Sequence, residues 1–220
     1  MLEEMTAFFE KRLSGYDAHM LTEIEGAAAF YPYTAAQLPD AERCEILDLG
    51  CGTGLELEPY FALNPSARVT AIDLSRGMLD ALQSKFPDRS LTLLCGSYFD
   101  VPLGRERFDA AVSVESLHHF TAEQKTALYR RLFEALKDDG FLILTDYFAE
   151  SPEHERAYFE ELARLRAAQN LSDASFYHYD TPLTVEHEIQ ALQAAGFSGC
   201  KVLNRWGATC TIKAVKKQPV

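Results

Sequence analysis

The chain has 220 residues, enough for one α/β domain with a sizeable core and a small appended lid but too few for two full domains. The formal net charge of -12 disfavours a nucleic-acid partner, because nucleic-acid affinity depends on clustered Lys and Arg residues that displace counterions. No apolar run approaches the roughly 20 residues of a membrane span, and the acidic N-terminus lacks the apolar core of a signal peptide. We therefore expect a cytoplasmic protein without a nucleic-acid or membrane partner.

The five cysteines are scattered along the chain. They form no C-x-x-C pair, and no histidine lies at metal-ligand spacing from them. This spacing predicts neither a zinc site nor a disulfide framework, so we expect no metal. Reduced and mostly buried thiols are expected at Cys44, Cys51, Cys95, Cys200 and Cys210.

The segment 1–40 lies ahead of the first expected strand and reads as two helices. Met5 and Phe9 fall on one face of the first helix, and Thr22 can cap the second. Residues 14–20, which include an aromatic residue and a histidine, are predicted to form the loop between the two helices.

From Glu45 onward the sequence alternates between strands and helices. The predicted strands are 46–49, 68–73, 91–95, 108–114 and 141–148, and the predicted helices between them are 55–63, 75–86 and 121–137. Consecutive parallel strands are joined by right-handed crossovers, so this pattern predicts a doubly wound sheet with helices on both faces.

An insertion interrupts this alternation after the fifth strand. Residues 153–169 are predicted to form a charged amphipathic helix, and residues 173–182 form a run too rich in aromatic residues for an inert linker. The insertion leaves from the carboxyl end of the fifth strand, which in an open α/β sheet is the edge where ligands bind. We therefore expect a lid insertion at about 150–182.

The end of the chain predicts one more helix and two more strands. The helix 185–195 is followed by Gly196 as its C-cap, and the apolar runs 199–204 and 208–215 are joined by a short turn. Such a connection makes an antiparallel hairpin. The fold class we expect is α/β, with a doubly wound, mostly parallel seven-stranded sheet and an antiparallel C-terminal strand.

The stretch that carries most chemical information is the loop Asp48-Leu-Gly-Cys-Gly-Thr-Gly54. Its glycines let the backbone turn tightly with no Cβ atom between it and a ligand, and the free N–H groups of the next helix face the loop. The dinucleotide fingerprint is G-x-G-x-x-G, but Leu55 occupies its final position here. This difference weakens the prediction of NAD binding.

A carboxylate, Asp73, ends the second strand roughly 20 residues beyond the loop, where the ribose-binding acid of such folds lies. In these features the sequence resembles the class I S-adenosylmethionine (SAM)-dependent methyltransferases, from about Glu45 to Lys216 and most specifically from Glu45 to Phe120. The resemblance implies a Rossmann-like methyltransferase domain at 41–220 and a helical lid segment at 1–40 that closes over the cofactor.

The same resemblance assigns the cofactor contacts. The glycines pass the methionine end of SAM, Asp48 orders the loop or meets the ammonium group, and Asp73 accepts the ribose hydroxyls. Ser97 stands where the family usually has an adenine-binding acid, with the backbone of Tyr98 or the side chain of Asp100 as alternatives. The cofactor-binding residues implied are Asp48, Gly50, Cys51, Gly52, Gly54, Asp73, Leu74, Met78, Ser97, Tyr98 and Glu115.

Methyl transfer from a sulfonium is an in-line displacement for which a protein mainly supplies orientation and desolvation. By the same resemblance, the segment that contains Tyr16 closes over the sulfonium, and Glu115 and His118 lie where the family places residues under the methyl group, so the candidate catalytic residues are Tyr16, Glu115 and His118. A histidine near neutrality can take a proton from an attacking hydroxyl or amine.

The predicted function is methyl transfer from SAM to a small-molecule acceptor. The sequence leaves open whether the attacking atom is oxygen, nitrogen, sulfur or carbon, and whether the protein forms a homodimer. The alternatives are an NAD-dependent reductase and a non-catalytic SAM-binding module that serves as a sensor or partner subunit.

Overall fold

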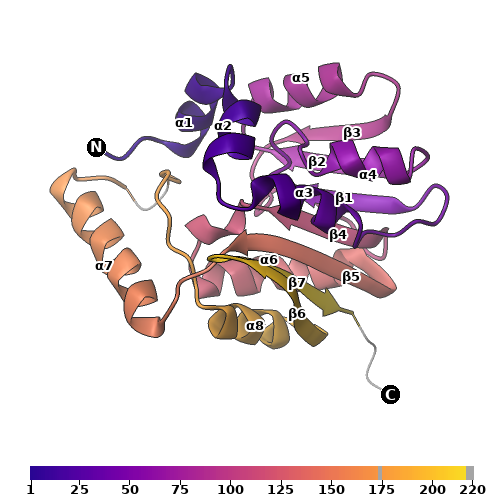
Figure 1. Ribbon diagram of the computed structural model, residues 1–220. Helices are drawn as coiled ribbons and strands as arrows, with labels where there is room; N and C mark the ends of the chain where they lie inside the picture. The colour runs from indigo at the N-terminus through magenta and orange to yellow at the C-terminus, as the bar shows by residue number, and fades with distance from the viewer. Residues whose placement is uncertain (173–174, 217–220) are drawn as a thin grey trace.

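The computed structural model describes residues 1–172 and 175–216, so the last residues of the expected domain, 217–220, lie outside the described part. The chain forms a seven-stranded sheet with the strand order β3-β2-β1-β4-β5-β7-β6 (Figure 1). The strands are β1 Glu45–Leu49, β2 Arg68–Asp73, β3 Ser90–Cys95, β4 Phe108–Val114, β5 Leu136–Tyr147, β6 Ser198–Trp206 and β7 Thr209–Val215.

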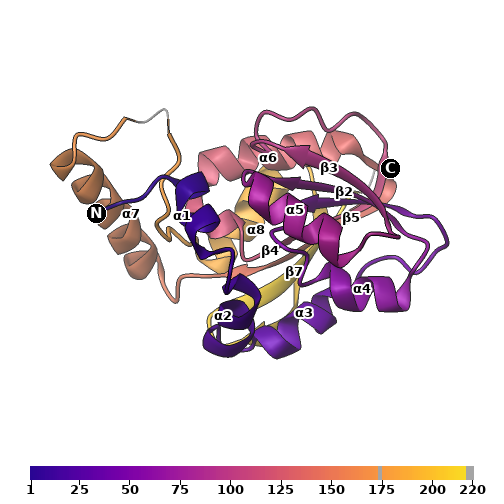
Figure 2. The ribbon, with the colours of Figure 1, turned by 90° about the horizontal axis from the view of Figure 1, so that it is seen from above.

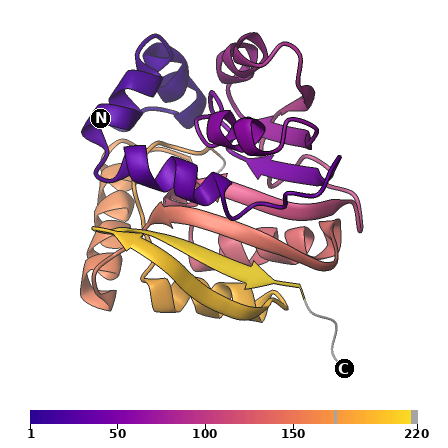
Figure 3. The same cartoon turned by 45° about the vertical axis from the view of Figure 1, so that its right-hand side comes forward.

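The pairing of the strands confirms the predicted fold class. Strands β1 to β5 pair in parallel, and β7 runs antiparallel to both β5 and β6. Figure 3 shows the hairpin of β6 and β7 at one edge of the sheet. The strand order reverses between β1 and β4, which places the switch point of the sheet beside the glycine loop that follows β1.

Helices cover both faces of the sheet (Figure 2). The helices are α1 Met5–Arg12, α2 Tyr16–Glu23, α3 Ala27–Ala35, α4 Leu57–Leu63, α5 Arg76–Lys85, α6 Ala122–Ala135, α7 Pro152–Ala168 and α8 Val185–Ala194, with the 3-10 helix η1 Leu117–His119. Leu47 and Leu49 of β1 join the core that lies under α6 and α8, whereas Ile46 joins the core under α3 and α4. Burial on both faces explains why β1 reads as an almost continuous apolar run.

The N-terminal segment differs from the prediction, which placed two helices there with a loop at 14–20. Most of that loop is the helix α2, and Gly26, at a left-handed φ of 80°, precedes a third helix. Thr22 does not cap a helix; it lies inside α2, where its hydroxyl donates to the Ala18 carbonyl at 2.8 Å. The prediction was wrong because glycine, rather than threonine, takes the conformation needed between these helices.

A second difference concerns the boundary between α6 and β5. The predicted helix 121–137 ends at Ala135, and β5 begins at Leu136, earlier than the predicted 141. Leu136 has an extended backbone and pairs with Phe108 of β4. Sheet pairing therefore extends the strand into residues that continue the helical pattern in the sequence.

The segment 1–12 and the insertion after β5 meet although they lie far apart in the sequence. Glu4 forms an antiparallel bridge with Tyr177, and Met5 N–H donates to the Phe176 carbonyl at 2.9 Å. The insertion carries α7, none of whose side chains is buried, and α7 stands at one end of the molecule (Figure 1). That the two segments act as a lid stays a prediction. No helix in the described ranges is long and apolar enough to cross a membrane.

Candidate functional site

At two positions of the glycine loop after β1, the backbone takes a conformation that favours glycine. Gly50 and Gly54 have φ angles of 69° and 76°, in the left-handed region. A Cβ atom added at Gly50 would lie 2.0 Å from Ser116 Oγ, and one at Gly54 would lie 2.4 Å from Leu82 Cδ1. Packing and conformation therefore both require these glycines. Cys51 lies in the same loop and is buried.

The carboxylate of Asp73 connects the end of β2 to this loop. Its Oδ2 accepts the Gly52 N–H at 2.9 Å, and its Oδ1 accepts the Ser75 N–H at 2.8 Å. Burial raises the pKa of Asp73, although both backbone N–H groups oppose this shift. Asp73, Leu74 and Met78 line one small cavity beside the loop. The residues predicted to meet the ribose and the adenine thus lie together.

A second acid of the loop, Asp48, is completely buried. Among the described residues, neither of its carboxylate oxygens has a hydrogen-bond partner. Burial and the neighbouring Glu56 raise the pKa of Asp48 well above its usual range, and burial also raises the pKa of Glu56. A buried acid whose nearest charged neighbour is a second carboxyl group is costly, and a cation that arrives with a ligand, such as the ammonium group of SAM, would relieve that cost. In the described part of the chain, Asp48 lines neither cavity, so its contact with the ammonium group stays a prediction.

Two cavities adjoin at the carboxyl edge of the sheet. The smaller one, of about 50 Å³, lies over the glycine loop, and the larger one, of about 770 Å³, lies beside it under the N-terminal helices. Both are lined by Phe9, Tyr16, Glu115 and His119. These shared residues mark the place where a group bound over the loop would meet a group bound in the larger cavity.

The smaller cavity is nearly filled by the N-terminal segment. The Tyr16 ring lies 3.5 Å from the position that a Cβ atom at Gly52 would take, and Met5 and Phe9 also line this space. Pockets for small molecules usually enclose about 300 to 1,000 Å³. A nucleotide-sized cofactor would therefore displace Tyr16 and its neighbours from the loop.

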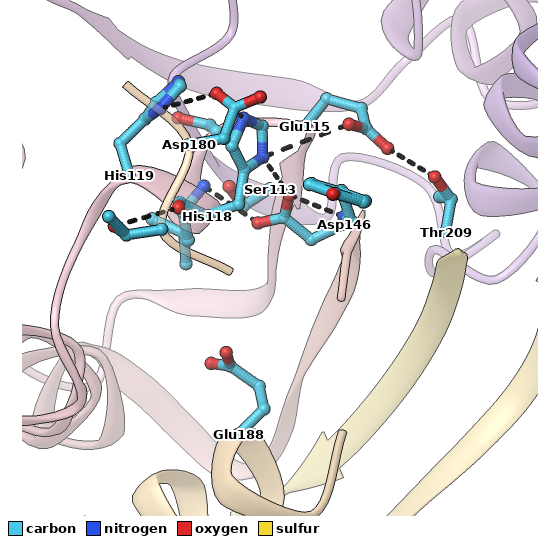
Figure 4. Close-up of polar contacts among 12 residues, drawn as sticks. Ser113, Glu115, His118, His119, Asp146, Asp180, Glu188 and Thr209 are labelled. Carbon is cyan, nitrogen blue, oxygen red and sulfur yellow. Dashed lines mark hydrogen bonds and ion pairs between the residues drawn. The ribbon is translucent and has the colours of Figure 1, made fainter. Parts of the chain in front are cut away.

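A cluster of histidines and carboxylates lies where β4 ends (Figure 4). His118 Nδ1 is 2.6 Å from Oδ1 of Asp146 at the end of β5, and its Nε2 is 3.5 Å from Oδ1 of Asp180. His119 Nδ1 lies 3.4 Å from the same Asp180 oxygen. Glu115, at a left-handed φ of 48°, accepts a hydrogen bond from Thr209 Oγ1 at 3.0 Å. The cluster unites side chains from β4, β5, β7 and the insertion.

The charges in this cluster shift the pKa values of neighbouring groups in opposite directions. Burial lowers the pKa of His118, but Asp146 and Asp180 outweigh it and hold this pKa well above its usual range. Burial and the neighbouring His118 lower the pKa of His119 to about 3. Burial and the charge of Asp146 raise the pKa of Glu115 to about 7.

The predicted adenine contacts are only partly brought together. The Ser97 hydroxyl accepts the Phe99 N–H at 3.1 Å, and within the described ranges Ser97 lines neither cavity. Tyr98 does line the smaller cavity, and its hydroxyl donates to the Ser116 carbonyl at 3.3 Å. The choice among Ser97, Tyr98 and Asp100 stays a prediction.

Sequence reasoning did not assign three residues that the structure places at the site. His119 and Asp180 line the larger cavity, and Thr209 holds the Glu115 carboxylate. One signal was available for Asp180, because it lies in the aromatic run of the insertion. Thr209 carried no such signal, since the pairing of β5 with β7 brings it to this edge.

The fold and the glycine loop define an α/β protein that holds a nucleotide-type cofactor at the carboxyl edge of its sheet. Residues 46–140 match the family described as "Methyltransferase domain". The malonyl-acyl-carrier-protein O-methyltransferase of Acetivibrio thermocellus is 27% identical over 139 residues, which are 63% of this chain and 47% of that enzyme.

Two solved structures show the same fold at low sequence identity. Human N-acetylserotonin methyltransferase in complex with SAM matches with a TM-score of 0.68 and 16% identity, over 96% of this chain and 57% of that chain. A SAM-dependent methyltransferase from Thermotoga maritima matches with a TM-score of 0.69 and 20% identity, over 97% and 100% of the two chains.

Residues 46–140 therefore carry a methyltransferase domain, and the similarity to curated methyltransferases supports SAM as its cofactor. The resemblance found in the sequence is thereby confirmed. The chain spans between 26% and 66% of the length of four curated relatives that it matches.

Proposed function

We propose that the protein methylates a small-molecule acceptor held in the larger cavity. The observation that carries this proposal is the cavity of about 770 Å³, which adjoins the glycine loop and shares Tyr16 and Glu115 with the cavity over that loop. Its volume lies within the range usual for small-molecule pockets. The N-terminal segment and the insertion both contribute side chains to its lining, which favours a small acceptor over a polymer.

The residues around the loop would hold the cofactor. SAM, when bound, supplies a methyl group that its positively charged sulfur activates for displacement. The backbone at Gly50 and Gly52 would face the methionine end once Tyr16 is displaced, and Asp73 keeps lone pairs free for the ribose hydroxyls while it orders the loop. Asp48 offers a carboxylate for the ammonium group.

The residues shared by both cavities would orient the acceptor. Glu115 is held at its strained φ of 48° and fixed by Thr209, so its carboxylate keeps one position beside both cavities. His118 faces the larger cavity, and Asp146 fixes the orientation of its ring. Tyr16 lies over Gly52 and lines both cavities, so after displacement by the cofactor its ring would lie between the cofactor and the acceptor. We propose these three residues as the contacts of the acceptor and of the transferred group.

Labelled SAM gives the direct test of this function. Incubation with the full chain and a fractionated metabolite extract is expected to label one or a few small molecules. A SAM-binding sensor would label nothing, and a reductase would bind NADH in a calorimetric titration instead of SAM and its demethylated product. The family match and Leu55 in the loop already disfavour the reductase. Homodimer formation stays a prediction.

Bound SAM is expected to slow amide hydrogen exchange in residues 15–20 and 176–180 together. Lids come from the low-stability parts of a fold, and Phe9 of α1 links these two segments, because its ring centroid lies 6.3 Å from that of Tyr16 and 5.7 Å from that of His178. Hydrogen-exchange mass spectrometry with and without SAM measures this effect, and residues 198–202 of β6, which line neither cavity, serve as an internal control that should not change. Protection confined to the glycine loop and Asp73 would show that the segments are not a cofactor-ordered lid.

A further inference from the structure

Three side chains that line the larger cavity bring possible metal-ligand atoms close to one another. His118 Nε2 lies 3.5 Å from Asp180 Oδ1, His119 Nδ1 lies 3.4 Å from the same oxygen, and these three atoms lie within 4.8 Å of one another (Figure 4). Zn²⁺ binds imidazole nitrogen and carboxylate oxygen at about 2.0 to 2.2 Å in tetrahedral geometry, which separates neighbouring ligand atoms by about 3.4 Å. The measured separations from Asp180 agree with that geometry.

The surroundings of His118 are those of a metal ligand. Its Nδ1 lies 2.6 Å from Asp146 Oδ1, which leaves Nε2 as the ring atom that faces the cavity. Asp146 is fixed in turn, because its carboxylate accepts the backbone N–H groups of Leu117 and Tyr147 at 2.9 Å each. A histidine that ligates a metal almost always donates its other ring N–H to such a carboxylate.

The donor set and the charge favour a divalent transition metal over Mg²⁺. Two imidazoles and one carboxylate suit Zn²⁺ and Fe²⁺, whereas Mg²⁺ prefers oxygen ligands. Asp146 and Asp180 bring two negative charges to two imidazoles, and a divalent cation would balance them. His119 Nδ1 now donates a hydrogen bond to the Tyr179 carbonyl at 3.2 Å, and a cation bound at Nδ1 would replace that proton.

We propose that His118 Nε2, His119 Nδ1 and Asp180 Oδ1 bind one divalent transition-metal cation at the floor of the larger cavity. Three protein ligands with one open position are the pattern of catalytic rather than structural zinc sites. The open position would face the cavity and bind a lone pair of the acceptor beside Glu115. That last role rests on the proposed function; the cation site itself does not.

Calorimetric titration of the chelator-treated full chain with Zn²⁺ tests the site. Wild type is expected to bind one Zn²⁺, and His119→Ala and Asp180→Ala are each expected to lose at least tenfold in affinity. His154→Ala is the matched control, since His154 is an exposed residue of α7 outside the cluster, and it is expected to bind as wild type does. Substitution with Co²⁺ gives a second readout, a visible absorption band that the two cluster variants lose.

The outcomes separate this proposal from the proposed function. Absence of Zn²⁺ binding by wild type, or equal affinity in wild type and both cluster variants, overturns the cation site. Thermal unfolding of each variant shows whether a loss of binding comes from misfolding, and Asp180→Asn is a milder variant that keeps the side-chain shape. Cation binding is measured without SAM or acceptor, so a failed methylation assay leaves this result unaffected.

Discussion

Replacing Asp73 with alanine is expected to weaken SAM binding about tenfold to a hundredfold, the equivalent of about 1.5 to 3 kcal/mol for hydrogen bonds to a charged group. The loss has two sources. The variant lacks the acceptor for the ribose hydroxyls, and it frees the N–H groups of Gly52 and Ser75 that the carboxylate now binds at 2.9 and 2.8 Å. The glycine loop would therefore lose part of its order before the cofactor arrives.

Calorimetric titration with SAM measures this change, and Asp80→Ala is the matched control. Asp80 is an exposed acid on α5, so its removal alters the net charge equally without touching the loop. Circular dichroism during heating reports whether Asp73→Ala still folds. A dissociation constant equal to that of wild type would place the ribose site elsewhere in the molecule.

Replacing Lys125 with methionine is expected to lower the free energy of unfolding by about 3 to 5 kcal/mol, because it leaves a buried charge without its partner. Lys125 Nζ lies 2.5 Å from Glu188 Oε2, and both side chains are buried between α6 and α8. The Tyr129 hydroxyl donates to the other Glu188 oxygen. Glu188 lies apart from the histidine cluster (Figure 4), so the direct loss is one of stability, although the charge of Lys125 also helps to lower the pKa of Asp146.

Urea unfolding compares this variant with Lys137→Met, which removes a much more exposed ion pair with Asp109. The control is expected to lose at most about 1 kcal/mol, as exposed pairs do. The double variant Lys125→Met with Glu188→Leu removes both charges and is expected to recover most of the lost stability. Equal losses in Lys125→Met and Lys137→Met would mean that Glu188 is neutralised in another way.

The parts of the fold that the sequence predicted well are those whose burial is encoded locally. Strands β2 and β4 were predicted with the bounds that the structure has, because their apolar runs end at clear polar residues. The predicted helix 75–86 starts at Ser75, which caps it in the structure, where the Ser75 hydroxyl accepts the Met78 N–H at 3.2 Å. The prediction failed where long-range pairing overrides a local pattern, as at Leu136, which joins β5 although it continues the helical pattern of α6.

The candidate site also has one part that local sequence patterns predict and another that depends on contacts between distant segments. Gly50, Gly52 and Asp73 could be found in the sequence, because the loop and the acid belong to one β-α-β unit whose geometry follows from chain connectivity. The sequence did not predict which side chains contact His118. The acids that meet its two ring nitrogens, Asp146 and Asp180, are 28 and 62 positions further along the chain, counted from their residue numbers.

By itself, the sequence determined the class of fold and the position of the glycine loop after the first strand, since these depend on hydrophobic periodicity and on glycine spacing within short stretches. Only the tertiary structure decided that Tyr16 lies over Gly52 and that Asp180 reaches both histidines. Those contacts follow from the packing of the N-terminal helices and the insertion over the sheet edge. Contacts between distant segments leave no periodic pattern in either segment, so no local pattern could have predicted them.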